Sequence, residues 1–247
     1  MIKLENISKK YTAHNKEVVA LKDVEIKIKK GFITGIVGVS GAGKSTILDL
    51  MAGLIKPENG LINVDGLIIN NLNKNELSNY QKRLGIVFQD YNLLENLTVL
   101  DNVAMPLKLN GIKKEERIKE ALTVLEFIGL SHEKESYPSQ LSGGQRQRVA
   151  IARAIINKPE ILLLDEITSA LDQENANIII KLLLRINQEF NMTILLVSHD
   201  LLTIKKICNN VYIIKDGIIN DYIEIINNSK ISETFDYRKE ILGSDYV

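Results

Sequence analysis

The sequence predicts an α/β fold in which a parallel sheet carries a glycine-rich loop. Short apolar runs with few charges lie at residues 85–89, 161–165 and 193–197, as expected of central strands that are covered on both faces. A long stretch with helical periodicity, residues 99–157, separates the first run from the second and is expected to be wholly helical. The glycine-rich loop, residues 38–46, stands between another apolar run and a helical pattern.

The remaining elements follow in chain order. Alternating apolar and polar positions within residues 2–30 predict antiparallel strands, which stop at Gly31. Residues 60–66 predict a further strand and turn, and residues 210–225 predict a closing strand pair. Inside the helical stretch, apolar residues recur at helical spacing at Ile118, Leu122, Leu125 and Ile128.

These patterns divide one domain into three parts. Residues 1–90 and 158–225 are expected to form the α/β core with its antiparallel β subdomain. Residues 91–157 are expected to form a helical subdomain inserted into that core. The last part, residues 226–247, is a polar tail without a motif.

Composition excludes several classes of function. Among 247 residues, 31 Lys and Arg balance 31 Asp and Glu, so no overall charge favours nucleic acid or an anionic membrane. No apolar run approaches the roughly 18 residues of a membrane span, and the first residues lack a signal peptide's hydrophobic stretch, so we expect a cytoplasmic chain. The single cysteine, Cys208, predicts a core thiol, whereas His14 and His132 are expected at the surface.

The glycine-rich loop GVSGAGKST matches the pattern G-x-x-x-x-G-K-[ST] between a strand and a helix. Its backbone N–H groups and the helix dipole are expected to bind phosphate oxygens. Lys44 is expected to reach the β and γ phosphates and the Ser45 hydroxyl to ligate Mg²⁺. An ordinary glycine-rich turn is the alternative, which the flanking strand and helix disfavour. The predicted phosphate-binding residues are Gly38, Ser40, Gly41, Ala42, Gly43, Lys44, Ser45 and Thr46.

Polar side chains follow three of the predicted strands. Asp165 and Glu166 end the run ILLLDE, and we assign Asp165 to the metal and Glu166 to the general base that polarises the attacking water. Gln89 could place its amide oxygen on Mg²⁺ or on that water, although most glutamines at a strand end are simply solvated. His199 follows the run TILLV and is expected to hydrogen-bond the γ phosphate.

A second short motif, LSGGQ, precedes the helical run GQRQRVAIARAII. Ser142, Gly143 and Gly144 therefore predict a second helix N-terminus that glycines leave open to close approach by phosphate. One chain has no need of two such sites around one triphosphate, which points to a site shared with another chain. The alternative is that Ser142 only caps the helix, and this would be favoured if the phosphate loop were absent.

These motifs, in this order, resemble those of the ATP-binding cassette ATPases, the nucleotide-binding subunits of ABC transporters. The resemblance covers residues 1 to about 220. It implies a P-loop NTPase (RecA-like) core with an antiparallel β subdomain and an inserted helical subdomain. The match comprises the Walker A loop, the Q-loop at Gln89, the signature LSGGQ, Walker B, the D-loop and the switch histidine.

The same resemblance implies the rest of the site. Tyr11 matches the aromatic residue that stacks on adenine, Gln145 completes the signature, and Asp172 ends the D-loop. Two copies would pair head to tail, each burying ATP between its own Walker A loop and its partner's Ser142, Gly143 and Gly144.

Within the family, residues 85–111 and 137–155 are similar to the stand-alone subunits of the macrolide-export, lipoprotein-release and peptide-antibiotic-resistance group. The cell-division ATPase has nearly the same cassette. Two residues depart from the pattern: Ile167 replaces the proline usual after the Walker B glutamate, and Ser169 stands where much of the exporter group has glycine. The second departure leaves importer-type subunits open.

The resemblance implies ATP hydrolysis that drives a separate integral membrane permease, with the chain held at the inner face of the cell membrane by that permease. Export or extraction of a peptide, drug or lipid-linked substrate is the leading expectation. The alternatives are an importer ATPase and a division or signalling ATPase that moves no solute. A DNA-repair or chromosome ATPase would carry a long coiled coil, and residues 47–140 hold no sustained heptads. A translation-factor cassette would carry two ATPase copies in one chain.

The permease is expected to dock near residues 90–107, which are rich in apolar side chains. The alternative is that these side chains pack inside the helical subdomain. The residues concerned are Tyr91, Leu93, Leu94, Leu97 and Met105.

Overall fold

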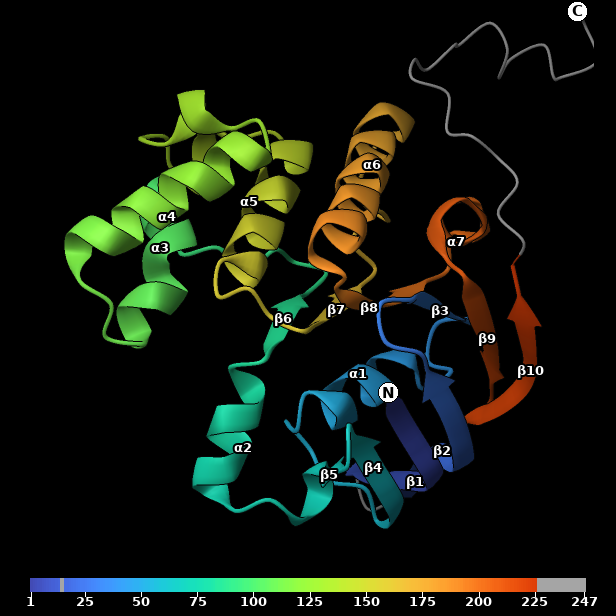
Figure 1. The fold of residues 1–247 in the computed structure, drawn as a ribbon. Coiled ribbons are helices and arrows are strands. Elements are labelled where there is room, and N and C mark those ends of the chain that lie inside the picture. Colours follow the sequence, from blue (N-terminus) through green and yellow to red (C-terminus); the bar gives the residue numbers. More distant parts are fainter. Residues whose placement is uncertain (14–15, 226–247) are drawn as a thin grey trace, which may run out of the picture.

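The computed structural model describes residues 1–13 and 16–225, which form two sheets and two groups of helices (Figure 1). The larger sheet has the strand order β10-β9-β3-β8-β7-β6, and all its neighbours run parallel except β10 with β9. Its strands are β3 (Ile33–Val37), β6 (Leu84–Val87), β7 (Ile161–Asp165), β8 (Thr193–Ser198), β9 (Asn210–Lys215) and β10 (Ile218–Glu224). The predicted parallel strands and closing strand pair are confirmed.

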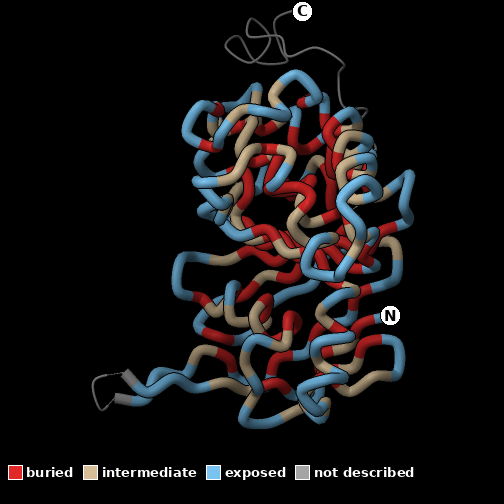
Figure 2. Tube along the Cα trace, turned by 90° about the vertical axis from the view of Figure 1, so that its left-hand side faces the viewer, coloured by how far each residue is buried: buried red, intermediate tan, exposed pale blue. Residues whose placement is uncertain are grey.

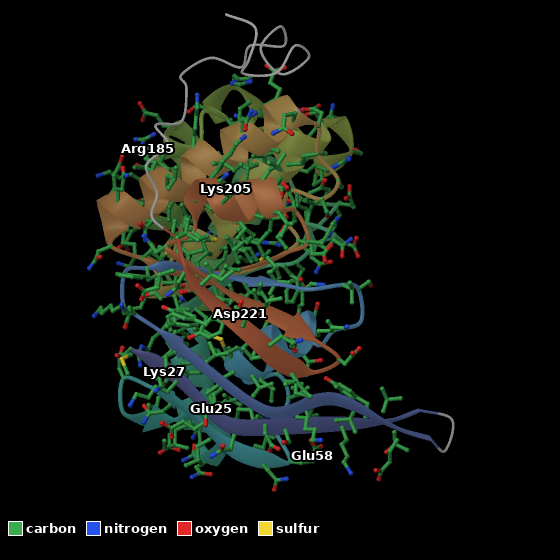
Figure 3. All side chains as sticks on the ribbon, turned by 90° about the vertical axis from the view of Figure 1, so that its right-hand side faces the viewer. Glu25, Lys27, Glu58, Arg185, Lys205 and Asp221 are labelled. Carbon is green, nitrogen blue, oxygen red and sulfur yellow. The ribbon has the colours of Figure 1, made fainter. Side chains whose placement is uncertain are left out.

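The smaller sheet is antiparallel, with the order β2-β1-β4-β5. Its strands are β1 (Ile2–Ala13), β2 (Lys16–Ile28), β4 (Asn59–Val64) and β5 (Leu67–Ile68). Glu58, labelled in Figure 3 beside the β1–β2 hairpin, accepts the Lys10 backbone N–H at 2.8 Å and pairs with Lys9 Nζ at 2.8 Å. The turn before β4 is thereby tied to the hairpin, as the predicted antiparallel subdomain requires.

Seven helices and three 3₁₀ turns are present in the described part of the chain. The helices are α1 (Lys44–Met51), α2 (Lys74–Gln81), α3 (Val99–Leu109), α4 (Lys114–Phe127), α5 (Gly143–Ile155), α6 (Gln173–Phe190) and α7 (Leu201–Ile207). The 3₁₀ turns are η1 (Ile69–Asn71), η2 (Ser131–Glu133) and η3 (Pro138–Gln140).

The strands of the larger sheet divide their side chains between two hydrophobic cores. In β7, Leu162 and Leu164 belong to the core built with α3 to α7, whereas Ile161 and Leu163 belong to the core built with α1 and the antiparallel sheet. This period of two is what a sheet covered on both faces requires. Figure 2 shows buried residues in both the upper and the lower half of the molecule.

The prediction that residues 99–157 are wholly helical was wrong in its linkers. The stretch contains α3, α4 and α5, but α3 ends before Gly111 at φ +78° and α4 before Gly129 at φ +71°. Left-handed glycines at these points end each helix. Pro106 stays inside α3.

Other expectations have mixed outcomes. Cys208 is fully buried and burial raises the pKa of its thiol, which confirms a core thiol, and His132 is exposed as expected. The strand predicted at residues 85–89 ends at Val87, so it stops short of Gln89. His14 and the tail, residues 226–247, lie outside the described residues.

Candidate nucleotide-binding site

The glycine-rich loop connects β3 to α1 at the carboxyl edge of the larger sheet. Helix α1 begins at Lys44, and its N-cap is Gly43, which is left-handed at φ +104° and has no side chain to cap the helix. The first N–H groups of α1 are therefore free of any side-chain acceptor and remain for an anion. This is the arrangement that the sequence predicts for a phosphate loop.

Close packing explains two of the loop's glycines. A Cβ added to Gly38 would lie 2.3 Å from the Ile214 carbonyl oxygen, and one added to Gly43 would lie 2.5 Å from the Ala20 carbonyl oxygen. Any side chain at either position would push the loop away from β9 or β2. Gly41 differs, because its φ of +78° rather than crowding requires glycine.

Lys44 is buried and its ammonium group is held by the loop itself. Its Nζ donates to the carbonyl oxygens of Gly38 and Val39, at 3.0 Å each, and lies 3.7 Å from Glu166 Oε1. A phosphate anion offers the same ammonium stronger, charged acceptors than these two neutral carbonyls. Lys44 thus holds its ammonium group at the loop. Phosphate oxygens would replace the two carbonyls as acceptors of its N–H groups.

Asp165 ends β7 beside the loop, and its environment suits a cation. Burial raises the pKa of its carboxyl group, a hydrogen bond from the Ser45 side chain lowers it, and the Glu166 charge raises it. Its Oδ1 is buried and has no hydrogen-bond partner. Such an orphaned oxygen beside the Ser45 hydroxyl matches the oxygen ligands that Mg²⁺ prefers.

A second carboxylate near Asp165, that of Asp49, was not among the predicted site residues. Burial and the Asp165 charge both raise the pKa of Asp49. Asp49 lies four residues, or about one helical turn, after Ser45 on α1. That spacing from Ser45 was the signal in the sequence that could have identified it.

Glu166 lies at the centre of the candidate site. Its Oε2 is 3.1 Å from His199 Nδ1, while its Oε1 faces Lys44. The backbone of Glu166 is left-handed at φ +49°, with its N–H bound to the Val197 carbonyl and its own carbonyl accepting from Ser169. Three predicted site residues, from the start of α1 and from the turns after β7 and β8, are therefore brought together.

Ile167 anchors the turn after Glu166 in the hydrophobic core. Its side chain is almost completely buried in the core shared with α5 and α6. The isoleucine that replaces the usual proline thus contributes apolar packing directly after Glu166.

Two predicted residues are not joined to this cluster. Gln89 is exposed and makes no hydrogen bond or ion pair with the described residues. Tyr11 is 39% exposed in β1 opposite Val18, with Lys9 Nζ 5.5 Å from its ring centroid. Its hairpin does approach the loop, because the Ala20 carbonyl stands against Gly43.

Ser142 is the N-cap of α5. Its Oγ accepts the Gln145 N–H at 3.2 Å, and Gln145 Oε1 accepts the Ser142 N–H at 2.8 Å. A Cβ on Gly144 would lie 2.1 Å from Asn175 Oδ1, and Asn175 in turn binds Asp172, the N-cap of α6. The starts of α5 and α6 are therefore packed together.

No hydrogen bond joins residues 142–145 to residues 38–46 within the described chain. Gly143 is less crowded than Gly144, because the nearest atom to a Cβ added at Gly143 is 3.4 Å away. Ser142 is exposed. The second helix N-terminus is thus available to another molecule rather than to its own loop.

The fold and site define a class of protein: an α/β nucleotide-binding domain with a phosphate loop, a carboxylate pair and an inserted helical subdomain. A family model described as ABC transporter matches residues 21–169. That segment is more than half of the chain, so the chain belongs to the ABC transporter family of ATP-binding cassette ATPases.

Relatives and solved structures support this membership. The methionine import ATP-binding protein MetN of Bacillus subtilis (strain 168) is 42% identical over 247 residues, which is 100% of this chain and 71% of that protein. MetN 2 of Enterococcus faecalis is 43% identical over 235 residues, 95% of this chain and 66% of that protein. The dimeric structure of the ATP-binding cassette MJ0796 with ADP and Pi has a TM-score of 0.84 and 38% identity, covering 91% of this chain and 99% of that one.

The predicted P-loop ATPase fold is confirmed, but the predicted subgroup is not. The relatives named above are methionine import proteins, not members of the macrolide-export and lipoprotein-release group. The serine at position 169 was the departure that left this outcome open. None of the helices in residues 1–13 and 16–225 is long and apolar enough to cross a bilayer.

Proposed function

We propose that this chain hydrolyses ATP between two copies of itself and drives an integral membrane permease that imports a small solute. The observation that carries the proposal is the position of Glu166, whose two carboxylate oxygens face Lys44 and His199 at the mouth of the phosphate loop. The MetN relatives are methionine import proteins, which supports import and supports methionine or a similar amino acid as the solute.

The roles follow from the contacts. Lys44 and the N–H groups of residues 40–46 bind the phosphates of ATP, and Tyr11 stacks on the adenine. Asp165 and Ser45, with Gln89, hold Mg²⁺, which neutralises phosphate charge when bound. The orphaned Asp165 Oδ1 is what supports this ligand set.

Glu166 is the general base. Its carboxylate polarises the attacking water, and the 3.1 Å contact with His199 Nδ1 orients that carboxylate. The buried side of the site excludes bulk water, which strengthens these interactions.

The second copy completes the site. The exposed N-terminus of α5 supplies N–H groups to the far side of the phosphates, with Ser142, Gly143, Gly144 and Gln145 as the partner's contribution and Asp172 beside them. The dimeric form of the MJ0796 cassette supports pairing.

Lys44→Ala tests the phosphate loop. Removal of the ammonium group costs contacts worth about 2 kcal/mol, so ATP affinity should fall about tenfold or more. Titration calorimetry or a fluorescent ATP analogue measures the change, with the exposed Lys56→Ala as the control of equal charge. Unchanged affinity in the Lys44 variant would count against the assignment.

The permease surface is narrower than the sequence suggests. Tyr91, Leu93, Leu97 and Met105 are half-buried, and Tyr91 and Leu93 pack against the core, as the alternative interpretation held. Leu94 is 41% exposed. We therefore place the docking contact at Leu94.

Leu94→Glu should uncouple the chain from its permease. Burial of a carboxylate in an apolar contact costs several kcal/mol, whereas the exposed position leaves folding intact. Basal ATPase should be retained and recruitment to permease-containing vesicles lost. Leu109→Glu, at an exposed leucine on the same subdomain, is the control. A large fall in the thermal midpoint of the Leu94 variant would show that Leu94 is a core residue.

A further inference from the structure

Residues 90–98 lie between β6 and α3, and side chains of α3 and α5 bind backbone groups of five of them. Arg153 of α5 makes two of these bonds with one guanidinium group. Its Nη2 donates to the Tyr91 carbonyl at 2.8 Å and its Nη1 donates to the Asn92 carbonyl at 2.6 Å. Hydrogen bonds from a charged donor are about twice as strong as neutral ones.

The two residues that Arg153 holds are in an unfavourable conformation. Tyr91 and Asn92 are consecutive left-handed residues, at φ +59° and +50°. Neither residue is glycine. L residues adopt the left-handed conformation mainly at single positions, so two in succession are unfavourable. The Arg153 contact, together with the backbone bonds from Tyr91 N–H and Asn92 N–H to Phe88 and Asp90, therefore keeps this turn in place.

Asn102 of α3 fixes the other half of the segment. Its side chain is fully buried, accepts the Leu94 N–H at 2.8 Å and donates to the Leu94 carbonyl at 3.0 Å. The same amide nitrogen donates to the carbonyls of Leu97 and Thr98. With both its backbone groups held, Leu94 keeps its side chain exposed on a fixed turn.

The segment also reaches the start of α5. The Arg146 guanidinium lies 5.5 Å from the centroid of the Tyr91 ring. The Tyr91 hydroxyl is the nearest atom to a Cβ added at Gly143, at 3.4 Å. The Tyr91 side chain therefore lies against the N-terminal end of α5, which carries the LSGGQ motif. Its backbone carbonyl is bound by Arg153, further along the same helix.

We propose that Arg153 and Asn102 are positioning residues that fasten residues 90–98 to α5 and α3, so that a force on Leu94 moves Ser142 as part of one rigid body. This rests on the proposed function, in which Leu94 contacts the permease and Ser142 faces the partner's ATP. Arg153 and Asn102 themselves touch neither ATP nor the permease in this scheme.

The matched variants are Arg153→Met and Arg148→Met. Arg148 is a second half-buried arginine of α5 whose Nη1 holds a backbone carbonyl, that of Ile128, and burial lowers the pKa of both guanidinium groups. Loss of either removes one half-buried charge from the same helix. Only loss of Arg153 releases residues 90–98.

Spin labels at Glu95 and Ser139, both exposed, measure the distance between the segment and the turn before Ser142 in a Cys208→Ala background. We expect one narrow distance distribution with and without ATP in the parent and in Arg148→Met. In Arg153→Met the distribution should broaden at least about twofold. Arg153→Lys keeps the charge but loses the planar guanidinium that donates to both carbonyls. Its distance distribution should have an intermediate width.

A distribution in Arg153→Met as narrow as in Arg148→Met would overturn the proposal for Arg153. Asn102→Leu provides a second test, because it frees Leu94 while leaving the Arg153 contacts, and it should broaden the same distribution. ATP binding by the parent is measured in parallel. Failure of the parent to bind ATP would refute the proposed function, whereas the width comparison in the absence of ATP still decides the fastening.

Discussion

Glu166→Gln is expected to reduce steady-state ATP hydrolysis at least about 100-fold while ATP remains bound, because the amide cannot act as a base. The substitution preserves size, and binding depends on Lys44 and the loop N–H groups rather than on the carboxylate. ATP should therefore persist between two copies, and the dimer should accumulate. Phosphate release measures the first effect, and light scattering after gel filtration with ATP measures the second.

The control for this variant is Glu160→Gln. Glu160 lies immediately before β7, at the end of that strand opposite Asp165, and forms an ion pair with Arg83 at 2.8 Å. Its loss changes one charge in the same way and should leave turnover unchanged. Steady-state turnover near that of the parent in Glu166→Gln would remove Glu166 from the role of base.

Local patterns predicted most of the fold. The apolar runs of β7 and β8 are continuous because both faces of the sheet are covered, and this is visible in the sequence itself. Helix α2 was not predicted, although Asn73 and Glu76 have the spacing of a capping box in the sequence and form one in the structure. Its short length and polar composition concealed it.

Long-range contacts could not be predicted. The need for glycine at positions 38 and 43 comes from the carbonyls of Ile214 and Ala20, which are distant in the sequence. Arg153 and Asn102 read as an ordinary helical arginine and asparagine. Their function depends on which backbone carbonyls they meet, which only the folded chain shows.

The error over the subgroup has a chemical cause. The motifs that guided the prediction surround the nucleotide, and ATP chemistry is the same whichever way a permease moves its solute. The direction of transport is instead expected to depend on the residues that contact the permease. Among those predicted residues, only Leu94 is strongly exposed.

Ser142→Arg is expected to abolish both dimerisation and turnover while each monomer still binds ATP. Ser142 is exposed at the start of α5 and far in sequence from its own phosphate loop, so the added bulk leaves that loop intact. In a dimer the same bulk would occupy the place of the partner's phosphates. Ser139→Arg, at an exposed serine of η3 three residues earlier, controls for added charge and size. An active Ser142→Arg dimer would show that the site is not shared.

Mixing the two inactive variants tests the shared site most directly. A dimer of one Lys44→Ala chain and one Ser142→Arg chain contains one site with both defects and one site with neither. Phosphate release from the mixture should therefore rise well above the sum of the two variants measured alone. If each chain instead hydrolyses ATP with its own motifs, mixing will restore no activity, and the account of a site built from two chains is wrong.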